Sequence, residues 1–412
     1  MIEIQNNALH FSFPAIASEI EYRVDGHVAQ VLPSLLAEDR ETAAQQFIKK
    51  VRGCSPKAQE SIRSVVLQLS EEDIARQLKK QCLIVSGSLN GSSPGCMRID
   101  FQRTLRIPDD GKFYDLPPGI SRFPLRHVDD YAERLPSQWL ERGGAMMPMY
   151  QSEALWLSFS GEYPFALKIA AGKINAVSGE AWSEGLNRSP QDYLVRPHQP
   201  WLDGFAVGKG VIRQFVAMPL GAGYTVEEQL SGKAEFGGLQ FEAIPMKASH
   251  YFDSVLQRTL PRSLAEVIDD LIPDWCKDSG VRYCKSMSMG LGAGGRMNQH
   301  IYKDPYEPDA WDMGQSSRCF VHLCDAMMWR EITGEDPPHK PITPQEYADL
   351  DLPWFDYYRD DLAVLEGAKK LADIKSVNSI SEVKEGKPLD CNDSVEVPFV
   401  ISCSPKHKSV TE

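Results

Sequence analysis

The residues best suited to chemistry gather between positions 296 and 325, where two histidines lie among several carboxylates. His300 and Asp304 are four positions apart, so they would share one face if this stretch were helical. With His322 they make the two-histidine, one-carboxylate set that mononuclear iron sites use. The segment is therefore a candidate metal or acid/base site. Its members are Arg296, His300, Asp304, Asp309, Asp312, His322 and Asp325.

The spacing of these residues does not select one chemistry. Each histidine is better explained as a structural residue that satisfies a hydrogen bond. In the enzymatic interpretation, His300, Asp304 and His322 bind a metal or exchange protons, and Arg296 assists them. No Walker A sequence, kinase motif set or G-x-S-x-G elbow accompanies them. The sequence therefore assigns no cofactor and no reaction class.

A glycine-rich run precedes this cluster. Gly290–Gly295 matches G-x-G-x-x-G and follows a predicted strand over 282–289. A dinucleotide site would need the run to open a helix, whose N-terminus would hold the pyrophosphate. Pro305 follows too soon to leave room for a full helix. We predict a flexible glycine turn, with a phosphate- or carboxylate-binding nest that includes Arg296 as the alternative.

A second candidate site lies among the predicted strands and tight turns of 198–246. The turn Gln199–Gly204 places a large aromatic residue close to a carboxylate. Trp201 and Asp203 would line a ligand cleft through stacking or cation–π contact, unless Trp201 folds back onto the β-core. Arg213 lies in an apolar strand and needs a partner carboxylate if it faces the core; facing outward, it is an ordinary surface residue. The predicted cleft is lined by Trp201, Asp203, Arg213 and Tyr224.

The composition of the chain limits the kinds of partner and the cellular location that we expect. The chain has 412 residues, a formal net charge of −13 and a pI near 5.3. This acidity, without a long Lys/Arg cluster, argues against nucleic acid as a partner. No run reaches the roughly 18–20 apolar residues of a membrane-spanning helix, and the N-terminus lacks a secretory signal. Nine scattered cysteines, an odd number without C-x-x-C, indicate reduced thiols in a cytoplasmic protein.

Hydrophobic patterning predicts the fold class. Ala154–Ser160 and 165–177 read as two strands with a tight turn between them, and such turns favour antiparallel pairing. We predict an α+β protein with an antiparallel β-rich core, a helical insertion and a mixed, mainly helical C-terminal half. The predicted divisions are a core of 1–38 and 96–250, a helical insertion with a Gly/Ser-rich loop at 39–95, a mixed region at 251–375 and a flexible tail at 376–412, in which Val395–Ile401 is a candidate late strand.

Five segments support the prediction for the C-terminal half. Ser263–Glu266 and Thr343–Glu346 have the capping-box pattern, and the second has proline at its first helical position. Arg318–Ile332 is apolar and continuous enough for a buried helix, and 362–374 reads as another. The aromatic run Trp354–Tyr358 fits helical packing at least as well as ligand binding.

These observations leave three function classes open. The favoured one is a cytosolic binding or accessory protein with a ligand cleft on its β-core, for a small molecule or a protein partner. The first alternative is an enzyme that uses the residues of 296–325. The second is an acidic scaffold subunit that docks a basic partner. The binding or accessory protein is favoured because no catalytic motif supports the enzyme.

Overall fold

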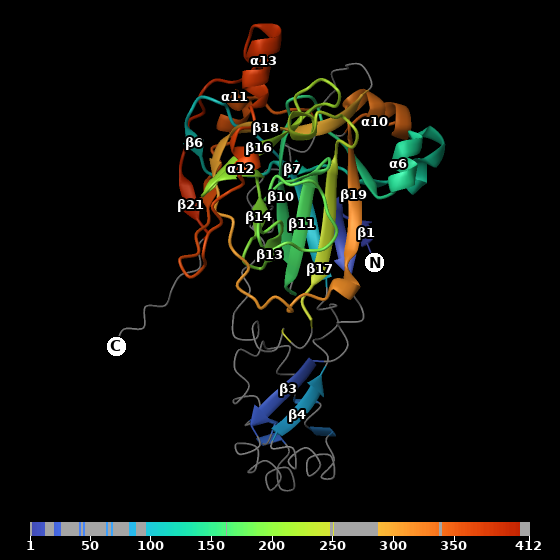
Figure 1. Ribbon diagram of the computed structural model, residues 1–412, viewed down its shortest axis with the longest axis vertical. Coiled ribbons are helices and arrows are strands. Elements are labelled where there is room, and N and C mark those ends of the chain that lie inside the picture. Colours follow the sequence, from blue (N-terminus) through green and yellow to red (C-terminus); the bar gives the residue numbers. More distant parts are fainter. Residues whose placement is uncertain are drawn as a thin grey trace.

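Strands dominate the computed structural model, which describes residues 2–12, 20–25, 41–42, 44–45, 63–64, 67–68, 82–87, 96–161, 163–247, 250, 287–337 and 340–403. Within these residues, 17 strands belong to one hydrogen-bonded network (Figure 1). They are β1 (Ile2–Gln5), β2 (Ala8–Ser12), β5 (Cys96–Thr104), β6 (Phe113–Tyr114), β7 (Ser121–Arg122), β8 (Arg126–His127), β9 (Ala145–Pro148), β10 (Ala154–Gly161), β11 (Phe165–Ala171), β12 (Ile174–Asn175), β13 (Leu194–Arg196), β14 (Trp201–Leu202), β15 (Gly204–Gly208), β16 (Val211–Pro219), β17 (Leu239–Pro245), β18 (Ser288–Asn298) and β19 (Ser317–Cys324).

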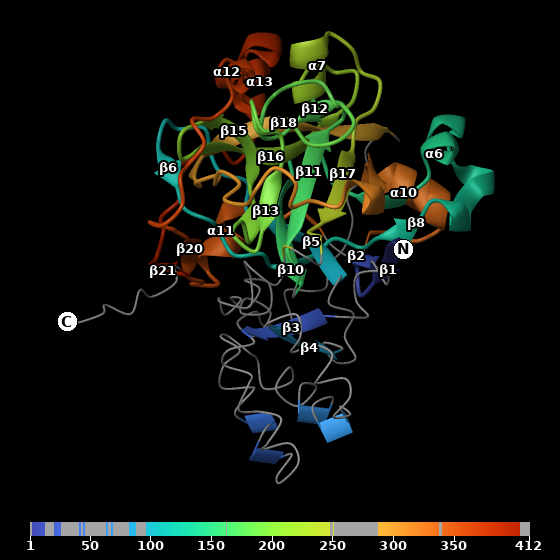
Figure 2. The same cartoon turned by 60° about the horizontal axis from the view of Figure 1, so that its bottom comes forward.

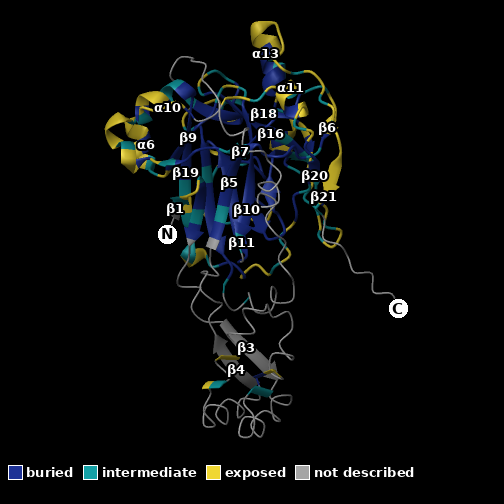
Figure 3. Cartoon of the chain, turned by 180° about the vertical axis from the view of Figure 1, so that it is seen from behind, coloured by how far each residue is buried: buried dark blue, intermediate teal, exposed yellow. Residues whose placement is uncertain are grey.

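Two layers of antiparallel strands enclose the main core. One layer runs β1–β2–β5–β10, and the other runs β13–β11–β17–β19. Figure 1 shows β11 and β17 on the near side, and Figure 3, from behind, shows β5 and β10. Phe101 of β5 and Phe241 of β17 meet across the interior, edge to face, with ring centroids 5.7 Å apart. Strands β16 and β18 pair along their lengths and join the layers, because β16 also pairs with β10 and β18 with β19.

The prediction of a mainly helical C-terminal half is wrong. Arg318–Ile332 is not one helix: it divides at Asp325 into strand β19 and helix α10 (Ala326–Thr333). The Asp325 side chain accepts a hydrogen bond from the Met328 amide and so caps α10. An apolar run of this kind does not distinguish a buried strand from a buried helix by periodicity, because both bury all their faces. The fold is therefore a sheet-rich antiparallel structure with short peripheral helices.

The predicted helix over 362–374 is reduced to α12 (Lys369–Ala372). Gly367 precedes it with φ +80°, and a Cβ there would lie 2.4 Å from the Gly208 backbone. The Ala368 amide then bonds to the Ala206 carbonyl, so this segment packs against the sheet edge instead of coiling.

The glycine run is a strand and not a turn. Gly290–Gly295 lies inside β18, buried and paired with β16. A Cβ on Gly292 would lie 2.5 Å from Cγ1 of Val377, and one on Gly290 would lie 2.8 Å from Cγ2 of Thr225. The glycines therefore allow neighbouring segments to pack directly on the strand. Neither a helix N-terminus nor an exposed nest is present in this run.

Short helices lie at the periphery of the sheets. Three of them, α7 (Val226–Ser231), α12 and α13 (Val377–Glu385), lie at one end of the sheets (Figure 2). The capping box at Thr343–Glu346 is confirmed: it opens α11 (Pro344–Ala348) with Pro344 in the first turn. No helix in the described ranges is long and apolar enough to cross a membrane. The remaining described elements are α6 (Ser137–Arg142), 3-10 helices at Asp129–Arg134 and Met313–Gln315, a parallel pair of β20 (Trp354–Asp356) and β21 (Val400–Ser402), and an antiparallel pair of β3 (Ile20–Asp25) and β4 (Cys82–Gly87).

Most of the predicted helical insertion, 39–95, lies outside the described residues, as does the capping box at Ser263–Glu266. The predicted flexible tail contains α13 and β21, while 404–412 is not described. Ser376 caps helix α13 at its N-terminus: its hydroxyl accepts a hydrogen bond from the Ser379 amide.

A second apolar cluster covers the outer face of β5 and β10. It contains Trp156 of β10, Trp201 of β14 and Trp354 of β20, so the C-terminal part of the chain supplies its cover. Strand β10 is consequently buried on both faces, apart from its last residue, and is dark blue for most of its length in Figure 3. This second cluster positions the region around Trp201 and a surface cleft beside Trp354, which are both described next.

Candidate functional site

Trp201 and Asp203 lie on the outer face of the β5–β10–β14 layer. Trp201 is opposite Ser158 of β10, and Gln102 of β5 is opposite Trp156. Because side chains alternate along strands, Trp156, Ser158 and Gln102 share the face of Trp201. Asp203, two residues after Trp201, continues on this face. We call these five residues the buried polar array: Gln102, Trp156, Ser158, Trp201 and Asp203.

Every member of the buried polar array is at most 3% exposed. Each carries a buried polar atom without a hydrogen-bond partner among the described residues: the Gln102 amide nitrogen, both indole nitrogens, the Ser158 hydroxyl and both Asp203 oxygens. A buried polar group without a partner costs about 1–3 kcal/mol. The array is thus a concentrated polar region under an apolar cluster.

Burial raises the pKa of the Asp203 carboxyl well above its ordinary value, and the negative charge of Asp115 adds to this shift. An unpaired carboxylate in this position would be costly, so the protonated form is favoured. The Asp203 backbone is fully used, since its amide bonds to Oε1 of Gln299 and its carbonyl accepts from Phe215.

Two glutamines fix the turn that carries the array. The Trp201 carbonyl accepts hydrogen bonds from Nε2 of Gln199 at 3.1 Å and of Gln299 at 3.0 Å. Trp201 itself is 3% exposed and packs edge-on to Tyr357, with ring centroids 5.5 Å apart. The aromatic side chain of this turn therefore packs inside the second cluster.

The other two residues of the predicted cleft lie elsewhere. Nη1 of Arg213 donates to the Gly294 carbonyl at 2.9 Å and is 3.4 Å from Asp109. Tyr224 belongs to a separate cluster beneath α13, where its hydroxyl donates to Glu385 at 2.9 Å. The structure brings Trp201 and Asp203 together but does not gather all four residues around one cleft.

The predicted metal or acid/base residues are also dispersed. The register of β18 and β19 places His322 beside the start of β18, whereas His300 follows its end. Roughly 30–35 Å of extended backbone separates these positions along the strand. Among the described residues, no group of three or more His, Cys, Asp or Glu side chains is placed to hold a metal ion.

His322 has a structural environment. It stacks on Trp139 with centroids 4.4 Å apart, and its Nε2 is 3.1 Å from the Gly143 carbonyl oxygen. Burial lowers the pKa of His322 to about 3, so it is neutral at physiological pH. His300, by contrast, is half-buried against the edge of Tyr358.

Asp304 is a buried structural hub. It accepts hydrogen bonds from the Tyr193 hydroxyl at 2.6 Å and the Trp311 indole at 2.8 Å, and it pairs with Arg188 at 3.0 Å. Arg296 is exposed and lies over the Phe113 ring. Neither residue contacts His300 or His322.

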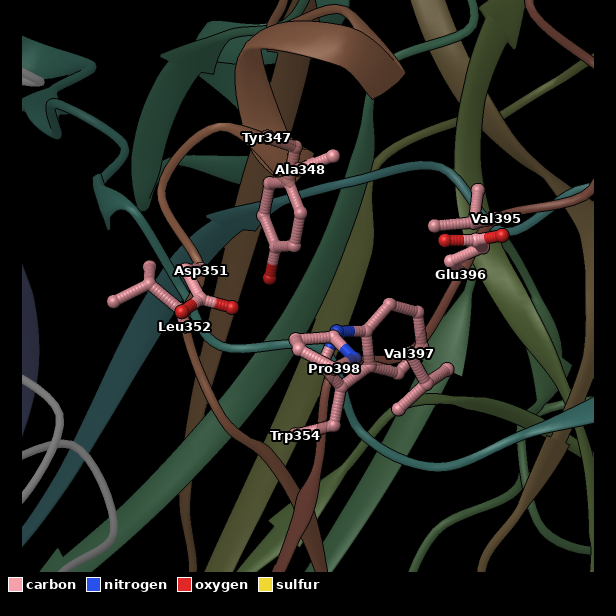
Figure 4. A pocket seen from close by; sticks show the side chains of 9 residues that line it. All are labelled: Tyr347, Ala348, Asp351, Leu352, Trp354, Val395, Glu396, Val397 and Pro398. Atoms are coloured by element: carbon pink, nitrogen blue, oxygen red, sulfur yellow. The ribbon is translucent and has the colours of Figure 1, made fainter.

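A surface cleft of about 360 Å³ opens at the edge of the second cluster (Figure 4). Helix α11 and the turn after it form one wall, and the segment 395–398 forms the other. The floor is buried and largely apolar, with Trp354 and Tyr347 in edge-to-face contact. Asp351 and Glu396 are exposed at the rim, on opposite sides in Figure 4. The lining residues are Tyr347, Ala348, Asp351, Leu352, Trp354, Val395, Glu396, Val397 and Pro398.

Hydrogen bonds from the loop 106–114 hold the 395–398 wall in place. The Ser394 hydroxyl donates to Oδ2 of Asp110 at 2.6 Å, and the Tyr114 hydroxyl donates to the same oxygen at 2.7 Å. Just before this wall, the Asn392 side chain accepts from the Asp109 amide at 3.0 Å. The cleft therefore joins three segments that are far apart in sequence.

The sequence pattern does not predict this cleft. The aromatic run at Trp354 fits helical packing at least as well as ligand binding. The residues of its other wall, 395–398, lie in the segment that was predicted to be a flexible tail. The strand that the sequence favours over Val395–Ile401 is shorter and later in the structure, as β21, and 395–398 forms the wall of the cleft.

Comparison with known protein families, curated proteins and solved structures gives no match.

Proposed function

We propose that this chain is a binding protein whose ligand occupies the cleft between α11 and the segment 395–398. The observation that carries the proposal is the cleft of about 360 Å³ with a buried aromatic floor and a polar rim. Small-molecule sites are commonly concave, mainly apolar and about 300–1,000 Å³ in volume. The volume suits a small organic molecule.

The construction of the cleft supports binding. The Tyr347 hydroxyl donates to the Pro118 carbonyl at 2.7 Å, and this hydrogen bond fixes the orientation of the Tyr347 ring in the floor. Trp354 is fixed between Tyr347 and Tyr114, whose ring centroid lies 5.9 Å away. A floor held this firmly loses little conformational freedom when a ligand arrives, which favours affinity.

The enzymatic alternative receives less support. Its residues His300, Asp304 and His322 have separate environments, and Asp304 is already committed to three partners. The cleft itself contains no histidine, cysteine or serine to act as a nucleophile or general base beside its two carboxylates. We therefore place binding ahead of catalysis. The odd, scattered cysteines favour a cytoplasmic location for this activity.

Filling the cleft tests this proposal. Ala348 is an exposed lining residue, so Ala348→Trp should occupy the cleft without disturbing the core. Saturation-transfer NMR with a library of small aromatic and aliphatic fragments of mixed charge would compare this variant with the wild type. Ala372→Trp, at an exposed position of α12, is the matched control.

We expect fragments that bind the wild type and Ala372→Trp to lose their signal with Ala348→Trp. Equal binding to all three proteins would place the ligand elsewhere. A wild type that binds no fragment would also overturn the proposal.

A further inference from the structure

We propose that the ligand of the cleft is a small organic monocation, an amine or quaternary ammonium that carries an apolar group. This inference rests on the proposed function and adds the chemical class of the ligand. It follows from the rim, the floor and the unbalanced charge of the cleft.

The rim is acidic without compensation. Asp351 and Glu396 are its two charged lining residues, and none of the other lining residues is basic. Neither carboxylate forms an ion pair with a residue in the described part of the chain. Neither Lys209, which pairs with Glu366 at 2.8 Å, nor Arg359, which pairs with Asp361 at 2.7 Å, lines the cleft. The cleft thus presents negative charge that a cation would neutralise, and an anion would be repelled.

The floor selects against an inorganic ion. Calcium and magnesium require six or more oxygen ligands, whereas the floor is made of Trp354, Leu352 and Tyr347. A buried, largely apolar floor instead suits the apolar part of an organic ligand. The apolar part of such a ligand would lie on the floor, and its charged nitrogen would lie at the rim between the carboxylates.

The position of Asp351 permits a clean test. Its φ is +47°, in the left-handed region, which aspartate and asparagine tolerate better than most residues. Asp351→Asn therefore removes the charge and keeps the backbone preference. Glu396→Gln is the corresponding change on the opposite side. Glu141→Gln, on exposed α6, changes the net charge equally at a distant place and is the control.

Isothermal titration calorimetry with three matched probes separates charge from shape. The probes are 2-phenylethylamine, 2-phenylethanol and 3-phenylpropanoate, titrated into the wild type and each variant at low salt. We expect the amine to bind most tightly. Asp351→Asn and Glu396→Gln should each weaken amine binding by about 2- to 5-fold, as for exposed ion pairs, and leave the alcohol unchanged. Higher salt should weaken the amine in the same way.

The outcomes are distinguishable. If the alcohol binds as tightly as the amine and neither variant matters, the inference is overturned, while loss of alcohol binding in Ala348→Trp would keep the proposed function. If the carboxylate probe binds best, the inference is again overturned. If no probe binds, the inference fails and the fragment comparison alone decides the proposed function. An equal effect of Glu141→Gln would show that net charge, not the cleft, attracts the amine.

Discussion

Ser394 donates a hydrogen bond to Oδ2 of Asp110, a residue 284 positions earlier in the chain, at 2.6 Å. This contact ties the wall of the cleft to the loop 106–114. Lys112 reinforces it through a hydrogen bond to the Ser394 hydroxyl at 3.1 Å. The shape of the proposed binding site thus depends on contacts that lie outside the cleft itself.

Removing the Ser394 hydroxyl should loosen this wall. Ser394→Ala leaves the Asp110 carboxylate with one donor fewer, at a cost of about 0.5–1.5 kcal/mol. We expect faster amide hydrogen exchange in 390–403, weaker ligand binding and a free energy of global unfolding that falls by no more than this amount. Ser137→Ala, at an exposed position of α6, is the control. Unchanged exchange in Ser394→Ala would show that other contacts hold the wall.

The same contact should weaken in acid. Burial acts to raise the pKa of Asp110, but hydrogen bonds from Ser394 and Tyr114 outweigh it and hold the pKa below its ordinary value. A depressed folded pKa stabilises the folded state above the unfolded pKa of about 3.9, and this contribution disappears as pH falls through the folded value. Hydrogen exchange in 390–403, corrected for intrinsic rates, should therefore increase below about pH 4 in the wild type. Asp110→Asn should remove this dependence; persistence of the dependence would assign it to another group.

Asp203 should make the folded state less stable as pH rises, whereas Asp110 makes it less stable as pH falls. The folded pKa of Asp203 is raised, mainly by burial, so its stabilising contribution is complete below the unfolded pKa and is lost as pH rises toward the folded value. Asp203→Asn cannot titrate. Urea unfolding should show the wild type losing stability relative to this variant from about pH 4 upward, by at most about 1.4 kcal/mol per pH unit. A difference that stays constant with pH would contradict a protonated Asp203; Asp373→Asn, on the surface, controls for charge.

Gly292 should tolerate no side chain. An added Cβ would lie 2.5 Å from Cγ1 of Val377 and 2.9 Å from the Tyr224 carbonyl oxygen. We expect Gly292→Ala to destabilise the protein by about 1–3 kcal/mol through overpacking. Gly208→Ala is the matched control, since its nearest atom would be Cβ of Val211 at 3.6 Å. Equal free energies of unfolding for the two variants would show that the segments above β18 move away easily.

Local pattern predicted part of this fold. The strand predicted over 154–160 is present as β10. The one predicted over 165–177 ends at Ala171, where a turn at 172–173 leads back into β12, and β10 and β11 pair with other strands rather than with each other. The pattern failed where burial covers both faces, as in Arg318–Ile332. There, apolar content is the same for a strand and a helix, and the capping residue Asp325 in the middle of the run marked the division.

The glycine run shows a second limit. Gly290–Gly295 has the composition of a turn, but its glycines serve close packing on a strand. A turn and a closely packed strand can be told apart only by the segments that pack on the glycines. These segments come from distant parts of the sequence. The cleft was hidden for the same reason: Trp354 and Val397 are 43 positions apart and meet through tertiary contacts.

A crystal structure of the wild type with 2-phenylethylamine tests the central claim most directly. We predict electron density for the ring on the floor beside Tyr347 and Trp354, with the amine between Asp351 and Glu396. Density for the amine at another position, such as the buried polar array around Asp203, or an unoccupied cleft at saturating amine, would contradict the account.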